Sequence, residues 1–263
     1  MLTSGFVQTR YGQAYFRETG EGLPILLLHM TPGSSNIFLP AMALLSSAGY
    51  RAIAMDTMGY GNSDSIGENR NIDDFADAVI DLIDSLQLRK IVLVGLSTGS
   101  VIAAATAIKR VDLVGKLVLI EPGRFNTSSA QSRGYFGDRT ELDPEGEFLL
   151  RRWKQISTGF GGKLSLQQAF VLFVDALRSR EHQHEAYQAL VYYDLVGRLD
   201  QIVIPTLLIT GEHSTRQEPI GTFVQGIHHS TYVEMPNVAN APPLEDPDGF
   251  VASFLDWLKL ESH

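Results

Sequence analysis

The chain has 263 residues, with 21 Lys+Arg against 30 Asp+Glu and no cysteine. This length suits one domain with a large core, or one domain with an insertion. The net charge of −9 argues against nucleic acid or a membrane surface as the main partner, and the lack of cysteine excludes disulfides and a cysteine nucleophile. We expect a soluble, cytoplasmic protein, because the first 20 residues have no apolar run typical of a signal peptide.

The predicted elements alternate between strands and helices. In chain order they are a hairpin within 5–16, strands at 24–29 and 51–55, a helix over 71–88 with Asn71 as its N-cap, a strand at 91–94, a helix from Thr98, strands at 117–121, 206–210 and 231–235, and a helix over 246–260. Most of these strands are continuous apolar runs, and helical patterns separate many of them. This arrangement predicts an α/β fold with a mostly parallel sheet covered by helices on both faces.

The interval 122–202 breaks this alternation. It predicts helices at 145–155, 164–178 and 184–195, holds eleven aromatic residues, and has ten basic and ten acidic side chains. Because open α/β sheets bind ligands at the carboxyl ends of their strands, we expect 122–202 to be a helical cap on a core domain of 1–121 and 203–263. Trp153 and Tyr192 are then candidate substrate-binding residues. The alternative is that the aromatic residues only pack the interior of the insertion.

The segment Gly95-Leu96-Ser97-Thr98-Gly99 matches the pattern G-x-S-x-G. An apolar run precedes it and a helical pattern follows it, which is the context that a nucleophile on a sharp strand-to-helix turn requires. Such a turn exposes the Ser97 hydroxyl. It also directs the Thr98 amide, at the start of the helix, towards an oxyanion.

Four further segments carry a family resemblance, namely 29–35 (HMTPGSS), 56–64 (DTMGYGNSD), 204–212 (IPTLLITGE) and 241–247 (APPLEDP). With the serine motif, they resemble the α/β-hydrolase superfamily, in the capped branch of meta-cleavage hydrolases, epoxide hydrolases and haloalkane dehalogenases. The resemblance implies an α/β-hydrolase fold, Ser97 as nucleophile, and the Thr31 and Thr98 amides as oxyanion-hole donors. Met30 replaces a usual glycine beside the hole, where it is a candidate substrate contact.

The remaining family positions depart from the pattern. The catalytic histidine of the family falls on Asn240, and its aspartate falls on Ser214, or on Glu212 if the loop shifts. An asparagine side chain takes up no proton at neutral pH, so another group has to act as base. His213 is one candidate. It lies in the loop after the predicted strand 206–210, which we call the acid loop because the family carries its aspartate there. Glu121 is the other, because some relatives place their acid after the strand that it ends.

Three functions remain open from the sequence. The first is hydrolysis of a small, largely apolar ester, lactone or related carbonyl compound by Ser97. The second is a lyase, isomerase or cyclase that uses the oxyanion hole without a serine nucleophile, and the third is a ligand-binding protein without turnover. The sequence also allows Asn240 to be an introduced substitution. It shows no metal-ligand spacing and no phosphate-binding loop, so we expect no metal, no cofactor and a small-molecule partner, and it leaves the oligomeric state unknown.

Overall fold

The computed structural model describes residues 1–123, 143–159, 163–214 and 220–261. Its strands are β1 Thr3–Thr9, β2 Gly12–Thr19, β3 Pro24–Leu28, β4 Arg51–Met55, β5 Ile91–Leu96, β6 Val114–Ile120, β7 Thr206–Gly211 and β8 Ser230–Met235. Its α-helices are α1 Leu39–Ser47, α2 Ile72–Ser85, α3 Thr98–Lys109, α5 Glu147–Ser157, α6 Leu166–Arg178, α7 Gln183–Val191, α8 Ile220–Gly226, α9 Pro242–Glu245 and α10 Pro247–Leu260. Two 3₁₀ helices, η1 Ser35–Phe38 and η3 Val196–Gln201, complete the described elements.

The described strands form one sheet in the order β1-β2-β4-β3-β5-β6-β7-β8. Strand β2 is antiparallel to both of its neighbours, β1 and β4. All other neighbouring pairs, β4-β3, β3-β5, β5-β6, β6-β7 and β7-β8, are parallel. Parallel strands place their carboxyl ends along one edge, so the loops after β3, β5, β6 and β7 meet there. The predicted fold class and the predicted edge hairpin are confirmed.

Each central strand contributes to two apolar layers. On β3, Leu26 and Leu28 pack in one cluster with α2 and α3, whereas Ile25 and Leu27 pack in the other with α1 and α10. This alternation explains why the strands are apolar throughout, since both faces of the sheet are covered. It also holds the central strands rigidly, and with them the loops at their carboxyl ends.

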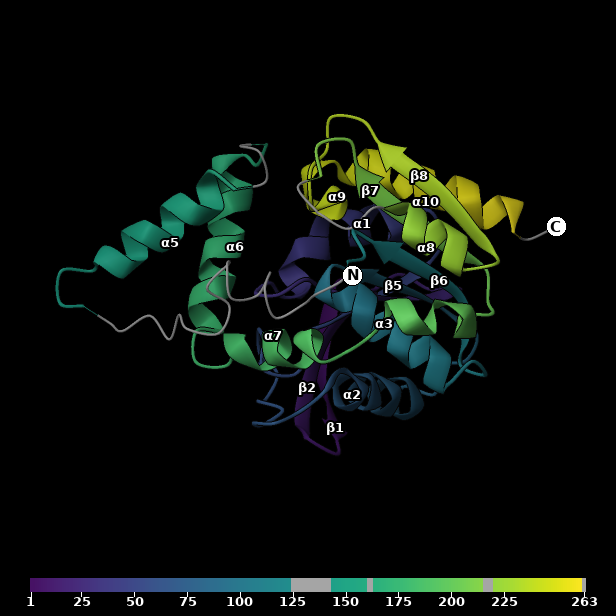
Figure 1. Ribbon diagram of the computed structural model, residues 1–263, viewed down its shortest axis with the longest axis horizontal. Coiled ribbons are helices and arrows are strands. Elements are labelled where there is room, and N and C mark those ends of the chain that lie inside the picture. Colours follow the sequence, from purple (N-terminus) through teal and green to yellow (C-terminus); the bar gives the residue numbers. More distant parts are fainter. Residues whose placement is uncertain (124–142, 160–162, 215–219, 262–263) are drawn as a thin grey trace.

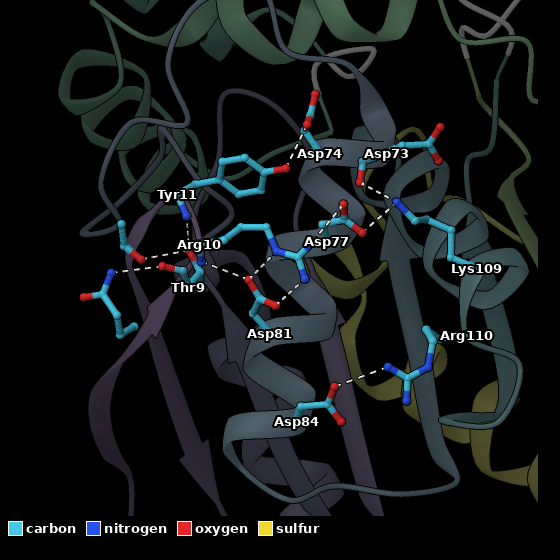
Figure 2. Close-up of polar contacts among 12 residues, drawn as sticks. Thr9, Arg10, Tyr11, Asp73, Asp74, Asp77, Asp81, Asp84, Lys109 and Arg110 are labelled. Atoms are coloured by element: carbon cyan, nitrogen blue, oxygen red, sulfur yellow. Dashed lines mark hydrogen bonds and ion pairs between the residues drawn. The ribbon is translucent and has the colours of Figure 1, made fainter.

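Helix α2 begins at the predicted N-cap, Asn71, whose side chain accepts from the Asp74 amide in a capping box. Its outer face carries a row of aspartates that pair with cations from other elements (Figure 2). Arg10, from the β1–β2 turn, reaches Asp77 and Asp81, and Lys109 at the end of α3 reaches Asp77. Exposed ion pairs of this kind each contribute about 0.2–1 kcal/mol to the stability of the fold. They therefore help to orient α2, whereas burial of its apolar face supplies most of the stabilisation.

The helices α5, α6 and α7 lie between β6 and β7 in the chain, and we call them the inserted helices. Figure 1 shows α5 and α6 on the left of the view, beside the sheet, with α7 below them. The predicted helix 184–195 is shorter than expected, because α7 ends at Val191 and η3 follows. Part of the predicted cap, 124–142 and 160–162, lies outside the described residues. Among the described helices, none is long and apolar enough to cross a membrane.

Candidate active site

Ser97 lies at the junction of β5 and α3, on a backbone turn with φ 58° and ψ −110°. This left-handed conformation is strained for a serine. A Cβ at Gly95 would collide with the Gly99 carbonyl, and a Cβ at Gly99 would collide with the Leu28 carbonyl. The two glycines of the motif are therefore required for the turn to close. The turn leaves Ser97 only 8% exposed.

Two hydrogen bonds tie the turn to β6. The Ser97 amide donates to the Ile120 carbonyl at 2.9 Å. The Ser100 hydroxyl donates its one proton to the Ile120 carbonyl at 2.7 Å, or shares it with the Gly95 carbonyl of β5 at 2.8 Å. These bonds stabilise a strained backbone from a neighbouring strand. The position of Ser97 is thus set by the sheet and not by the loop alone.

Glu121 lies next to Ser97 along the edge of the sheet, although the two residues are far apart in the sequence. Leu96 of β5 and Ile120 of β6 are partners in the parallel register, so the backbones of Ser97 and Glu121, the first residues after these strands, lie side by side at the carboxyl edge. Glu121 also has a left-handed backbone, with φ 50°, and its side chain is fully buried. The structure therefore places an acidic residue on a second strained turn, with its backbone next to that of the predicted nucleophile.

The carboxyl group of Glu121 has two hydrogen-bond donors from the acid loop. The Gly211 amide donates to Oε1 at 2.7 Å, and the Ser214 hydroxyl donates to Oε2 at 2.6 Å. Ser214 therefore supports a carboxylate from β6 where the family pattern places an aspartate. Glu212 points elsewhere, since its Oε2 accepts from the Asn237 amide at 2.9 Å and its side chain is half exposed. Glu121, Gly211 and Ser214 also line a cleft of about 180 Å³, whose lining residues do not include Ser97.

Asn240 lies in the loop between β8 and α9. Glu245 holds this loop on both sides of Asn240 by accepting from the amides of Ala239 at 2.8 Å and Ala241 at 2.7 Å. The loop is also fastened to the acid loop, because the His213 amide donates to the Val238 carbonyl at 2.9 Å. The backbone at Asn240 is therefore fixed at the carboxyl edge, beside the end of β7.

The segment 29–36, here called the Thr31 loop, approaches the start of α3. The Thr31 amide donates to the Thr98 hydroxyl, with N and O 3.4 Å apart, so the structure brings together the two predicted oxyanion-hole residues. An oxyanion bound at Thr31 has to compete with this hydroxyl for the amide proton. Met30 is 7% exposed and belongs to an apolar cluster that Trp153 of α5 packs against.

His29 is a buried, neutral histidine of the Thr31 loop. Its Nε2 accepts from the Thr57 amide at 2.9 Å, and its Nδ1 lies 2.9 Å from the Met30 carbonyl. These partners require the proton on Nδ1. Burial lowers the pKa of His29 below its ordinary value of 6.5. A charged imidazole is therefore disfavoured here, and the ring supports the backbone on either side of it.

We expect stability to fall as the pH drops below about 6.5, because the unfolded chain then takes up a proton that folded His29 rejects. The slope reaches at most about 1.4 kcal/mol per pH unit for one group. Urea unfolding between pH 5.5 and 7.5 measures it. His29→Gln, which removes the titration, should flatten the pH dependence while lowering stability at pH 7.5; an unchanged slope would show that another group causes it.

The other predicted residues are spread over different environments. His213 is 42% exposed, and its Nε2 lies 3.9 Å from Glu212; within the described residues, no hydrogen bond joins its ring to Ser97 or Glu121. Trp153 packs edge-on against Phe173 of α6, with ring centroids 5.5 Å apart. Tyr192, just after α7, is 80% exposed. Roles for these three side chains in catalysis or substrate binding stay predictions.

Two buried side chains of the inserted helices were missed by the sequence analysis. Tyr187 of α7 donates its hydroxyl to the Thr31 carbonyl at 3.0 Å, and Asp175 of α6 accepts from Ser34 and Asn36. A signal for Asp175 exists in the sequence, since it lies on the same helical face as Leu172 and Ala176. A charged residue on an apolar face often has a buried partner.

The match to a family model now identifies the class of protein. Residues 24–237 match the model of the alpha/beta hydrolase fold. The chain belongs to this family.

Two relatives align over nearly the whole chain. A hydrolase of (E)-2-((N-methylformamido)methylene)succinate from Acinetobacter baylyi is 26% identical, covering 94% of each chain. A 2-hydroxy-6-oxononadienedioate/2-hydroxy-6-oxononatrienedioate hydrolase from Pseudomonas putida is 28% identical, covering 98% of this chain and 96% of the relative. Among solved structures, an esterase from Exiguobacterium antarcticum superposes with a TM-score of 0.86 at 20% identity, over 98% of this chain and all of that one. The relatives support a hydrolase enzyme in general.

Proposed function

We propose that this chain hydrolyses a small, largely apolar carbonyl compound, an ester or a lactone, with Ser97 as nucleophile. The observation that carries the proposal is the strained turn that holds Ser97 between β5 and α3, beside Thr31 and Thr98. Strained backbone of this kind persists only where surrounding structure enforces it, and it is concentrated at active sites. Two full-length relatives are hydrolases, which agrees with this reaction class.

The proposed chemistry is acyl transfer. Ser97 Oγ attacks the carbonyl carbon, its proton passes to the Glu121 carboxylate, and the amides of Thr31 and Thr98 stabilise the oxyanion. Collapse of the oxyanion expels the leaving group, which takes the proton from Glu121. Glu121 then accepts a proton from the water that attacks the acyl-enzyme, and returns it to Ser97 Oγ when the acid product leaves. Because a carboxylate is a weaker base than an imidazole, it activates Ser97 less, and the substrate has to carry a leaving group that is itself a weak base. This requirement favours enol esters, enol lactones and aryl esters over alkyl esters and amides.

In this proposal the inserted helices form the cap of the site. Met30 belongs to the apolar cluster against which Trp153 of α5 packs, and this supports a role for both side chains in binding the substrate. The shared apolar packing supports an apolar substrate. It does not identify the acyl group, for which Tyr192 remains a candidate contact, and His213 remains the alternative candidate for the base.

Treatment with a small fluorophosphonate, followed by intact-mass spectrometry, tests the nucleophile. We expect one adduct per chain, lost in Ser97→Ala and kept in Ser47→Ala, which removes an exposed hydroxyl on α1. No adduct on the unmodified protein would contradict the proposal, and an adduct that survives Ser97→Ala would place the reactive group elsewhere.

A second candidate function is a lyase or isomerase on the same site. The specific observation in its favour is that Glu121, which is fully buried, follows the strand next to that of Ser97, while the usual base position holds Asn240. Here Glu121 moves a proton on carbon, and the amides of Thr31 and Thr98 hold an enolate oxygen. This function predicts no fluorophosphonate adduct but full loss of turnover when Glu121 is replaced.

A further inference from the structure

The Thr31 loop is held from two sides. From the core, His29 is anchored at Thr57, and the Ser35 amide donates to Asp56 Oδ1 at 2.7 Å. From the other side, α6 and α7 of the inserted helices reach the same loop through buried polar contacts. The loop that carries a proposed oxyanion donor is thus shared between two parts of the fold.

Asp175 makes the contact from α6. Its side chain is 1% exposed, and it lies 141 residues from Ser34 and 139 from Asn36 in the chain. The Ser34 hydroxyl donates to Oδ2 at 2.7 Å, and the Asn36 side-chain amide donates to Oδ1 at 3.0 Å. Burial raises the pKa of Asp175. An unpaired carboxylate here would be costly, so docking of α6 depends on these two donors.

Tyr187 makes the contact from α7. The residue is 8% exposed, and its hydroxyl donates to the Thr31 carbonyl at 3.0 Å. The amide and the carbonyl of Thr31 are attached to the same Cα atom. A hydrogen bond that fixes the position of the carbonyl therefore restricts the directions in which the Thr31 N–H can point. That amide is the one whose proton reaches Thr98. A helix outside the sheet therefore acts on the geometry of a proposed oxyanion donor.

We propose that Asp175 and Tyr187 are positioning residues, through which the inserted helices set the direction of the Thr31 amide. The proposal rests on the proposed function of Thr31 as an oxyanion donor. It implies reciprocal coupling, because whatever binds the correctly oriented amide also favours docking of α6 and α7 on the core. The inserted helices then do more than cover the substrate, since the oxyanion hole is complete only while they are docked.

Tyr187→Phe is the most selective test, because it removes one hydroxyl and keeps the ring. We expect hydrogen exchange in a peptide covering 29–38 to become about 3- to 10-fold faster, as for the loss of one hydrogen bond. The rate of fluorophosphonate labelling at Ser97 should fall by a similar factor. Tyr193→Phe is the matched control, because its hydroxyl contacts Arg198; it should change neither quantity.

Asp175 is tested by a graded pair of variants. Asp175→Ala removes both acceptors and should accelerate exchange in 29–38 and slow the labelling of Ser97. Asp175→Asn keeps an acceptor for Asn36 and can donate to the Ser34 hydroxyl, so it should restore most of the labelling rate. If Ser97 is labelled equally slowly in Asp175→Ala and Asp175→Asn, the hydrogen bonds of Asp175 to Ser34 and Asn36 do not set the labelling rate, and the positioning role of Asp175 is wrong.

The outcomes separate the two proposals. Faster exchange without slower labelling would show a merely structural contact and overturn the positioning role, as would no change in either quantity for Tyr187→Phe. If Ser97 of the unmodified protein takes no label, the proposed hydrolysis fails. In that case the positioning role is decided by an added carboxylate or boronate ligand, which should protect α6 and α7 from exchange in the unmodified protein and not in Tyr187→Phe.

Discussion

Replacing Asn240 with histidine is expected to raise the hydrolysis of p-nitrophenyl acetate by about 100-fold or more. In triad enzymes, removal of the base costs on the order of 10⁶ in kcat, and only part of that factor should return in a site not shaped around an imidazole. The expectation rests on the neighbours already present. Ser97 lies in its strained turn, and Glu121, whose side chain is buried, directly follows the neighbouring strand β6.

The gain has a recognisable pH dependence. A histidine at this position acts as a base only when neutral, so kcat/KM should rise with pH around 6–7. Asn240→Gln is the matched control, because it enlarges the amide without adding a proton acceptor, and it should show no gain. The double variant Asn240→His, Ser97→Ala should lose the gain. If Asn240→His is inactive although Ser97 still takes the fluorophosphonate label, the carboxylate cannot orient an imidazole there.

Replacing Glu121 with glutamine is expected to lower turnover by about 100-fold or more, since an amide accepts no proton at neutral pH. The fold should survive. The Gln oxygen can accept from the Gly211 amide, while its NH₂ group donates to the Ser214 hydroxyl. This rearrangement weakens one buried hydrogen bond, with an expected cost of about 1–2 kcal/mol.

Three measurements complete the Glu121 test. Steady-state kinetics on an aryl ester should show the loss in kcat with KM within a few-fold, and urea unfolding should confirm that the variant is folded. Glu212→Gln is the matched control, because it alters a half-exposed carboxylate in the same loop and should keep full turnover. An unchanged kcat in Glu121→Gln would leave Glu121 with a structural role only.

The central part of the fold was predictable because its signals are local. Continuous apolar runs, the cap at Asn71 and the turn at Ser97 each arise within a few residues, and the structure confirms them. Helix α1 was not predicted. Its sequence LPAMALLSS is apolar almost all round, so it shows no amphipathic period, although Ala41, Met42 and Leu45 are buried in the layer with α10.

The parts of the candidate site that directly follow strands were predictable from the sequence, whereas the contacts made by the inserted helices were not. Ser97 and Glu121 follow strands whose order the α/β pattern implies, so their adjacency is a consequence of topology. The contacts of Tyr187 and Asp175 join residues more than 130 positions apart. No local pattern encodes such a pair, because it depends on how the inserted helices dock.

The bond between Glu121 and Ser214 implies that these two positions together hold at most one ionised carboxylate. The hydroxyl lies 2.6 Å from the carboxylate oxygen, which is too close for a second ionised group, since two carboxylates in contact cannot both lose their protons. An acid contributed by β6 and an acid contributed by the loop after β7 are therefore alternatives. In this chain the residue after β6 supplies the carboxylate, and the loop after β7 supplies a neutral hydroxyl donor.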